Sequence, residues 1–328
     1  MRLKYKVILL VVCIFLVVAL ACLIVFFSII RRVSRNNAEW YALSACQRLT
    51  SGIDSYFQVL DSAAYTVIYS NWLQEYFQTH DTENSLELYT KERNVSHFFS
   101  SVSQIYNDIG IIAFDIDGRF VTTPNMRLAG INQDFEPEKI FPLLDRDKRL
   151  IDFGDSKDYL QNKPNTPAVS VYYELKDYHR LFRRGILVFH IPQSNIYSLL
   201  QEENAAHTVA LLNINGRVIY NNIWDDSVIA LTREQIRSGI YNLVIWDKNR
   251  LNATAFHKSE STGWIAAYRV PYSVFEKESF SGYIWLMYAL VPVSAFLLLI
   301  TLVFSSYLTT PIVLCTNAIR EIRNNWTD

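Results

Sequence analysis

The side chains that could do chemistry are few, and their spacing excludes the common catalytic and metal sites. The chain has six histidines, at positions 80, 97, 179, 190, 207 and 257, and none has the spacing of metal ligands. His190 lies in an apolar run and is interpreted as structural. Asp115 and Asp117 precede Gly118 as at the start of a calcium loop, but the later acidic ligands are absent, which favours a turn. No phosphate-binding glycine loop and no GxSxG nucleophile turn occurs. The sequence therefore predicts no catalytic residue, no metal site and no cofactor.

Three consecutive residues, Tyr172, Tyr173 and Glu174, could line a binding pocket. Pockets for small molecules are mostly apolar and carry a few placed polar groups, and two phenols beside a carboxylate fit that description. The alternative is an exposed strand whose aromatic side chains pack across to neighbouring strands. The residues alone leave both interpretations open.

Two apolar runs must flank the part of the chain that carries these residues. Residues 7–30 contain one polar side chain, Ser28, and residues 283–307 form a second run with Tyr283, Trp285 and Tyr307 near its edges. A helix needs about 20 apolar residues to cross a bilayer, so both runs are predicted to be transmembrane helices, the first uncleaved. Pro292 predicts a kink in the second. Basic residues flank both sides of the first run, but a loop of about 250 residues translocates largely regardless of charge. We therefore expect residues 31–282 outside the cell, with residues 1–6 and 308–328 cytoplasmic.

Composition and charge restrict the class of protein further. Half of the 328 residues are hydrophobic and the formal net charge is −1. These values argue against a simple soluble protein, a mostly disordered chain and a nucleic-acid binder. Two apolar runs are too few for a multi-span transporter. Cys46 is the only cysteine between the apolar runs, so no intrachain disulfide can form there.

The region after the first apolar run, residues 31–105, is predicted to be helical. Its apolar residues recur at a spacing near three to four and form a stripe: Leu43, Cys46, Ile53, Phe57, Leu60, Ala64 and Val67. This stripe could pair with a second copy of the chain or pack on its own domain. The sequence leaves the two alternatives equal, and both could hold at different heights along the helix.

An internal repeat of strands follows. Asp117-Gly118 and Asn215-Gly216 each separate two strand-like runs, which predicts two hairpins with type I′ turns. Each hairpin is followed by a strand that ends in Pro-x-Ser before a helix, at Pro192 and at Pro271. The same order twice predicts two modules, residues 106–200 and 201–282, in a mixed α+β fold.

This combination of a long helix, two hairpin modules and a strand ending in Val-Pro-Tyr-Ser before the second apolar run resembles the double-Cache sensor domain. The resemblance covers about residues 31–280. It implies a long N-terminal helix that carries two tandem PAS-like modules between two transmembrane helices, outside a bacterial membrane. It also implies a ligand in the membrane-distal module, residues 106–200, with residues 201–282 as the membrane-proximal module. The Arg-x-Trp-Tyr motif by which some members bind amino acids is absent, so no amino-acid ligand is predicted.

The residues after the second run form a heptad seam. It consists of Leu308, Pro311, Ile312, Cys315, Ile319, Ile322 and Trp326. This segment is similar to the first helix of a HAMP linker, a parallel four-helix bundle in dimeric receptors. The family usually has leucine where Cys315 stands and Gly-Asp near the helix end. The second HAMP helix does not occur in residues 308–328, so no independent bundle is expected from this segment.

Together these features resemble the sensor half of bacterial membrane sensor histidine kinases, especially the Firmicute type. The resemblance implies a homodimer in the lipid bilayer, an unknown small-molecule or peptide ligand outside, and a response regulator reached only through a kinase domain. No kinase domain lies in residues 1–328, so the chain is expected to be a fragment or a natural truncation without catalytic activity of its own. The alternatives are the sensor half of a chemoreceptor or membrane-bound transcription regulator, or a stand-alone membrane-anchored binding protein.

Overall fold

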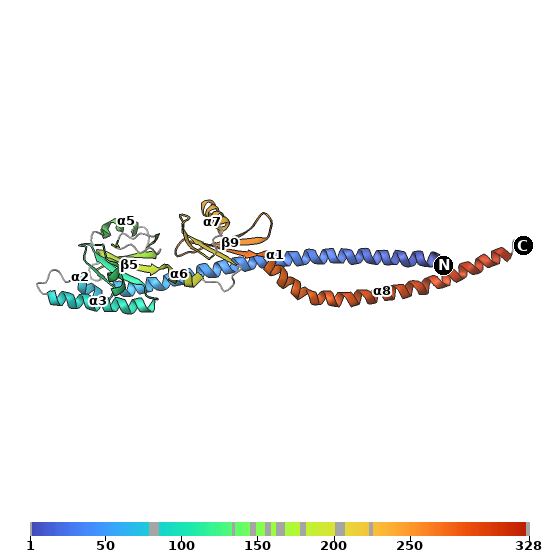
Figure 1. Ribbon diagram of the computed structural model, residues 1–328, viewed down its shortest axis with the longest axis horizontal. Helices are drawn as coiled ribbons and strands as arrows, with labels where there is room; N and C mark the ends of the chain where they lie inside the picture. The colour runs from blue at the N-terminus through green and yellow to red at the C-terminus, as the bar shows by residue number, and fades with distance from the viewer. Residues whose placement is uncertain are drawn as a thin grey trace. The chain divides into compact units, whose positions relative to one another are not determined.

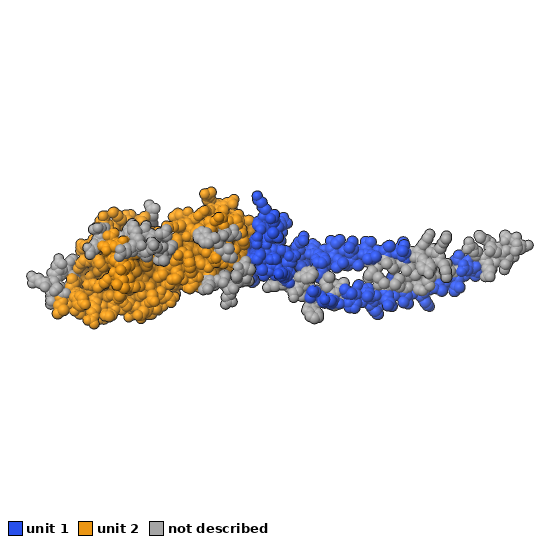
Figure 2. Space-filling view, in the orientation of Figure 1, with its two compact units in different colours: residues 1–41, 246–253, 270–328 blue, residues 42–245, 254–269 orange. Residues whose placement is uncertain are grey.

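The computed structural model describes residues 2–78, 85–132, 135–144, 149–154, 159–161, 168–177, 182–200, 207–222 and 226–325. It contains a long helix near each end of the sequence and two antiparallel sheets in the sequence between them (Figure 1). The chain forms two compact units (Figure 2). Unit 1 comprises Met1–Tyr41, Trp246–Ala253 and Val270–Asp328, and unit 2 comprises Ala42–Ile245 and Thr254–Arg269.

Helix α1 (Arg2–Ile68) runs without a break from the first apolar run into the region predicted to be helical. It contains no proline and a single glycine, Gly52, so nothing in its sequence interrupts the backbone hydrogen bonds. Among the described residues, one helix is long and apolar enough to cross a membrane, and it lies within Leu16–Ile68. The helical region 31–105 continues as α2 (Asn71–Gln78) and α3 (Ser85–Ile105).

The apolar stripe of α1 packs inside its own domain. Cys46, Ile53, Phe57, Leu60, Ala64 and Val67 are fully buried, and Leu43 is half-buried. The Cys46 thiol donates to the carbonyl oxygen of Ala266 at 3.2 Å, and the Phe57 ring lies 5.3 Å from that of Trp264, edge to face. Burying each large apolar side chain contributes about 1.5–3 kcal/mol, so this stripe stabilises the domain. Packing on its own domain is therefore confirmed for these buried residues, and pairing of α1 with a second copy stays a prediction.

The first module is built on a five-stranded antiparallel sheet with the order β2-β1-β5-β4-β3. Its strands are β1 (Gly110–Asp115), β2 (Phe120–Thr122), β3 (Leu150–Gly154), β4 (Ala168–Lys176) and β5 (Arg183–Pro192). The short helices α4 (Pro124–Ala129), η1 (Pro137–Lys139) and α5 (Phe141–Leu144) lie between β2 and β3 in the sequence, and α6 (Gln193–Leu200) follows β5.

The second module repeats this arrangement. Its strands are β6 (Thr208–Leu212), β7 (Val218–Asn221), β8 (Leu243–Trp246), β9 (Asn252–Lys258) and β10 (Ile265–Pro271), with α7 (Asp226–Ser238) between β7 and β8. The sheet order β7-β6-β10-β9-β8 matches that of the first sheet strand for strand. The predicted internal repeat is therefore confirmed.

Both hairpins form, but the predicted type I′ turns are wrong. Such turns need positive φ at two central residues, whereas Gly118 (φ 80°) and Gly216 (φ 77°) are positive and Asp117 and Asn215 are not. The Gly118 N–H donates to the carbonyl oxygen of Asp115 at 3.1 Å, and the Gly216 N–H donates to the carbonyl oxygen of Asn213 at 2.9 Å. These are three-residue loops, in which a turn is followed by one left-handed glycine.

Helix α8 (Tyr272–Asn325) begins directly after β10 and continues through Pro292 and Pro311. It contains the second predicted membrane span, residues 283–307, and most of the predicted seam. The apolar stretch that the structure describes in it is Val291–Thr301. The second span itself stays a prediction. One continuous helix thus joins the last strand of the second module to the C-terminal segment.

Two glycines test how these elements pack. Gly52 lies in the interior of α1 with open space around it, so Gly52→Ala should raise the free energy of unfolding by up to about 1 kcal/mol. A Cβ at Gly185 would overlap the carbonyl oxygen of Phe114 on the paired strand, so Gly185→Ala should lower it by about 1–3 kcal/mol. Chemical unfolding of the detergent-solubilised chain, followed by circular dichroism, measures both. If both substitutions changed the free energy of unfolding by the same amount and sign, the register of β1 and β5 would be contradicted.

Candidate functional site

Strand β4 places the three predicted pocket residues on opposite faces of the first sheet. Side chains alternate along a strand, so Tyr172 and Glu174 share one face and Tyr173 points to the other. In the register of the sheet, Tyr172 lies opposite Val188 and Leu150, and Tyr173 lies opposite Leu187. The three residues therefore do not line one pocket together.

The face that carries Tyr172 is covered by an aromatic and aliphatic layer. Tyr172 is 5% exposed, and its ring lies 6.2 Å from that of Tyr159. The buried cluster draws on the sheet, on α4 and α5, and on the segments around them. Its members are Ile112, Phe114, Met126, Ile131, Phe135, Phe141, Leu144, Tyr159, Leu160, Tyr172, Ile186 and Val188. Tyr172 is thus a core residue of this layer.

A polar cluster of two buried residues and one half-buried residue lies within this layer. Ser170 and His190 are paired across β4 and β5. The Tyr159 hydroxyl lies 2.5 Å from Ser170 Oγ and 2.8 Å from His190 Nδ1. Burial raises the pKa of Tyr159 well above its ordinary value, so the phenol stays neutral and acts only through hydrogen bonds. The sequence analysis considered His190 and interpreted it as structural, but it did not identify Tyr159. Nothing local to residue 159 indicates which strand it covers.

Glu174 is held by two cations on the same face. Its carboxylate accepts a hydrogen bond from Arg183 Nε at 2.6 Å and contacts Lys176 Nζ at 2.9 Å. Burial alone would raise the pKa of Glu174, but these two partners outweigh burial and lower it. Arg183 also lies over the Phe141 ring at 4.5 Å. Glu174 is therefore an ionised carboxylate with its charge already balanced.

Tyr173 points toward α1 and donates to Asp61 Oδ1 at 2.8 Å. Burial raises the pKa of Tyr173, and the neighbouring Asp61 charge raises it further. Asp61 also forms an ion pair with Arg149, whose guanidinium donates to the carbonyl oxygens of Phe57 at 3.2 Å and Ser261 at 3.0 Å. Arg149 precedes β3 of the first module, and Ser261 lies between β9 and β10 of the second. One side chain thus joins both modules and α1.

Asp54, seven residues before Asp61 on α1, binds the same loop of the second module. Its Oδ1 accepts from Ser259 Oγ at 2.5 Å, from Ser261 Oγ at 2.6 Å and from Ser261 N at 3.1 Å. Seven residues are close to two helical turns, so both carboxylates lie on one side of α1. We call Asp54, Asp61, Arg149 and Ser261 the module bridge.

Further contacts join the modules directly. Arg217, in the loop before β7, donates to the Phe153 carbonyl of β3 at 3.0 Å. The Tyr197 ring of α6 lies 4.8 Å from that of Tyr220 on β7. A change in the first module therefore has several physical routes to the second.

The predicted seam lies on α8, and its side chains are described in part. Pro311, Cys315 and Ile319 are exposed, with Ile319 at 67%. Leu308, Ile312 and Ile322 lie on the helical backbone, and Trp326 falls outside the described residues. The seam stays a prediction, since a heptad seam is completed only by a second helix.

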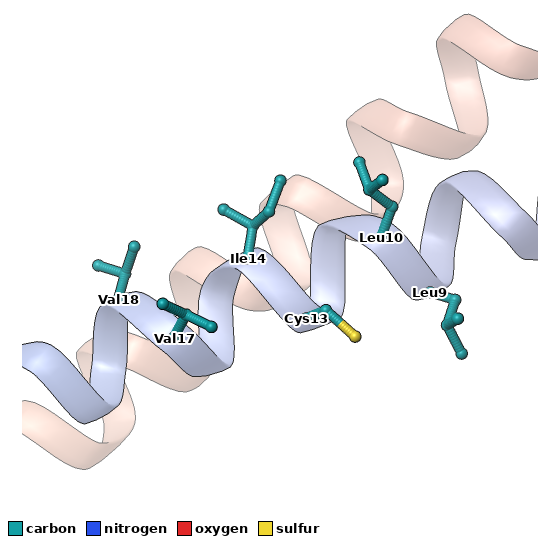
Figure 3. A pocket seen from close by; sticks show the side chains of 6 residues that line it. All are labelled: Leu9, Leu10, Cys13, Ile14, Val17 and Val18. Carbon is teal, nitrogen blue, oxygen red and sulfur yellow. The ribbon is translucent and has the colours of Figure 1, made fainter.

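A hollow on the apolar part of α1 is lined by six hydrophobic side chains of that one helix, among them Leu10, Cys13, Ile14 and Val18 (Figure 3). None of the six has a group that could fix a polar ligand. The hollow lies within the predicted span 7–30, where lipid chains would fill it.

Asp54 predicts an acid-sensitive contribution to stability. Burial alone would raise its pKa, but the hydrogen bonds from Ser259, Ser261 and Glu260 lower it. A depressed folded-state pKa stabilises the fold above the unfolded value of about 3.9, and this contribution is lost as the pH falls through the folded value. Asp54→Asn should therefore destabilise the chain at pH 7, and the difference should shrink below about pH 4. Asp117→Asn, in an exposed turn, is the control; a difference for Asp54→Asn that is constant from pH 7 to pH 3 would contradict the assignment.

The ion pair between Asp61 and Arg149 should couple more strongly than a surface pair. A double-mutant cycle with Asp61→Asn and Arg149→Gln is expected to give a coupling energy of about 1–3 kcal/mol, because the Arg149 side chain is 11% exposed. The control is the exposed pair Glu136 and Lys139, whose side chains are 62% and 72% exposed, expected near 0.5 kcal/mol or less. Urea unfolding of the four variants of each pair measures both energies. Equal couplings would show that the bridge adds nothing beyond a surface ion pair.

Comparison with known proteins finds similarity at the level of structure. No family model matches the sequence, and no curated protein matches it. The sensory domain of the Campylobacter jejuni chemoreceptor Tlp3, with isoleucine bound, is 9% identical with a TM-score of 0.54, over 75% of this chain and 97% of that domain. A domain of a putative sensory box/GGDEF family protein from Vibrio parahaemolyticus is 14% identical with a TM-score of 0.52, over 73% and 97%.

An extracellular ligand binding receptor from Desulfohalobium retbaense is 11% identical with a TM-score of 0.51, over 71% of this chain and 41% of that one. Identities this low establish a shared fold and nothing finer. The predicted mixed α+β fold, a long N-terminal helix with two tandem PAS-like modules, is therefore confirmed.

Proposed function

We propose that this chain is the ligand-sensing and signal-transmitting part of a dimeric bacterial membrane receptor, with a histidine kinase as its output. The observation that carries the proposal is the continuity of helices α1 and α8. Helix α1 runs unbroken from the first apolar run into the modules, and α8 leaves the last strand of the second module and runs to Asn325. A rigid helix on each side lets a small change in the modules reach the far end of the chain.

The proposed topology follows the apolar runs. Residues 1–6 are cytoplasmic, residues 7–30 and 283–307 cross the membrane, and residues 308–328 enter the cytoplasm as the start of a HAMP-like helix. The domain between the spans lies outside, with residues 31–105 as its helical region, residues 106–200 as the distal module and residues 201–282 as the proximal module. The similarity to a chemoreceptor sensory domain and to an extracellular receptor supports this arrangement.

The proposed ligand site is the covered face of the distal module, around Tyr159, Ser170, Tyr172 and His190. These residues combine an aromatic layer with a few hydrogen-bonding groups, which suits a small molecule or peptide with an apolar body. The Tlp3 domain is described with isoleucine, L-norvaline and L-valine. This chain lacks the Arg-x-Trp-Tyr motif, so its ligand is proposed to belong to another class.

The proposed mechanism is a population shift. A ligand that binds one arrangement of the covered face better than another biases the distal module, and the module bridge and α1 pass that bias to the proximal module and α8. Changing the ratio of two states from 1:99 to 99:1 needs about 10⁴-fold tighter binding to the favoured state. The ligand therefore has to contact residues that move, and the covering helices α4 and α5 are the candidates.

Two other functions remain as alternatives with a specific reason for each. The likeness to a chemoreceptor domain fits a chemoreceptor or a membrane-bound transcription regulator as well as a histidine kinase, because all three would use the same sensor half. A stand-alone membrane-anchored binding protein would need no seam on α8. The seam therefore decides between a signalling receptor and a binding protein.

Cys315 provides the test of a parallel dimer. In membranes that contain the chain with Cys13→Ala and Cys22→Ala, Cys315 is the exposed cysteine and Cys46 is buried. A seam brings the two Cys315 thiols of a dimer together, so mild oxidation should give a disulfide-linked dimer on non-reducing gels. Cys315→Ser should abolish it, and moving the cysteine to the off-seam position Asn317 should give little. Absence of the dimer at Cys315 would favour the stand-alone binding protein.

Ile319→Asp tests whether the seam controls output. A buried charge at a seam position destabilises one packing of the helices, so basal autophosphorylation of the complete receptor should change at least about fivefold or lock at one extreme. Asn317→Asp, two residues away on the other side of the helix, should leave it near the wild-type value. Wild-type output from both variants would overturn the role of the seam.

A further inference from the structure

A cavity of about 390 Å³ lies in unit 1 and is lined by residues of three segments. Helix α1 contributes Arg31 and Arg35, the turn between β8 and β9 contributes Arg250, and α8 contributes Tyr272 and Glu276. Three arginines line it against a single acidic residue. This is a preformed cationic pocket that the proposed sensing role does not use.

Of the neighbouring acidic groups, Glu39 pairs with Arg35 and so neutralises one of the three arginines. Glu39 accepts a hydrogen bond from Trp246 Nε1 at 2.6 Å and lies 3.6 Å from Arg35 Nε. Both carboxylate oxygens of Asp247 accept hydrogen bonds at the β8–β9 turn, from Leu251 N at 2.7 Å and from Asn252 Nδ2 at 2.8 Å. Among the side chains that the structure describes, neither Arg31 nor Arg250 has an ion-pair partner. The pocket therefore offers guanidinium groups to an anion.

Aromatic side chains hold the walls of the pocket in place. Arg35 lies over the Trp246 ring at 4.8 Å, and that ring lies 6.1 Å from Tyr272. The backbone N–H of Tyr272 donates to the Leu251 carbonyl at 2.7 Å and ties the start of α8 to the turn. Arginine stacked on an aromatic ring keeps its donors fixed, as planar recognition of a phosphate requires.

The position of the pocket along α1 indicates which anion it meets. Arg31 follows directly after the predicted span 7–30, and at 1.5 Å per residue Arg35 lies about 6 Å further along the helix. The headgroup layer on each side of the hydrocarbon core is about 5–8 Å thick. Both arginines thus fall at the depth of the lipid phosphates, and Trp246 and Tyr272 are the residue types that favour this layer.

We propose that this pocket binds the phosphate of an anionic phospholipid in the outer leaflet. The proposal rests on the membrane topology of the proposed function and extends it. It also gives a reason for arginines at positions 31 and 35, on the side of the span where basic residues are ordinarily depleted. The bound phosphate would clamp α1, the β8–β9 turn and the start of α8 together, where the second module passes into its helix.

The test is lipid retention by the full chain in detergent, measured by native mass spectrometry with phosphatidylglycerol or phosphatidylcholine. The wild type should retain phosphatidylglycerol in preference to phosphatidylcholine. The double variant Arg31→Gln, Arg250→Gln should lower its apparent affinity at least about tenfold, because each substitution removes a charge-assisted hydrogen bond. Arg32→Gln is the matched control: it removes the same charge from the adjacent, exposed residue that does not line the pocket.

Each other outcome overturns the proposal. Equal loss in the Arg32→Gln control means a diffuse charge effect and no site. Displacement of the lipid by millimolar inorganic phosphate means a free-anion site, and equal retention of both lipids means no headgroup recognition. Carbonate extraction of membranes tests the topology separately: a chain released by carbonate refutes the membrane anchor itself, whereas a chain that resists extraction but shows no lipid preference refutes the pocket alone.

Discussion

Burial of one face of α1 is the interaction on which the rest of the structure depends. Its stripe from Cys46 to Val67 is buried, and it contacts the second module through Cys46 and Phe57 and the first through Asp61. Each module has its own sheet and its own covering helices, yet each also uses this helix. The two modules are therefore not structurally independent, because removing the stripe would expose an apolar face on both.

The same helix face carries the polar contacts that set how the modules meet. Asp54 and Asp61 bind the loop after β9 and the residue before β3, and Arg149 connects the two sites. Apolar packing is non-directional and tolerates sliding, whereas these hydrogen bonds specify one alignment. In the proposed mechanism, a ligand that changes the first module acts on this alignment, and α8 begins where the second module ends.

The two modules share a strand order but differ in what covers the sheet. The first has α4, η1 and α5 over a layer rich in aromatic residues, with Tyr159 and Ser170 buried inside it and His190 half-buried beside them. The second packs α7 on a smaller cluster in which Phe256 is the one aromatic residue that the structure describes. The extra residues of the first module thus build a chemically richer face, which is the physical basis for placing ligand binding there.

The sequence by itself determined the local and repeating features of this protein. Apolar periodicity predicted α1 and its stripe, and Asp-Gly and Asn-Gly between strand-like runs predicted both hairpins and the repeat. Tertiary structure alone decided the turn type, the split of Tyr172 and Tyr173 across the sheet, and the partners of Glu174. It also decided the role of Arg149, whose contacts lie 88 and 112 residues away. Period and turn composition act over a few residues, whereas partners depend on strand order and register, which form only when distant segments pack.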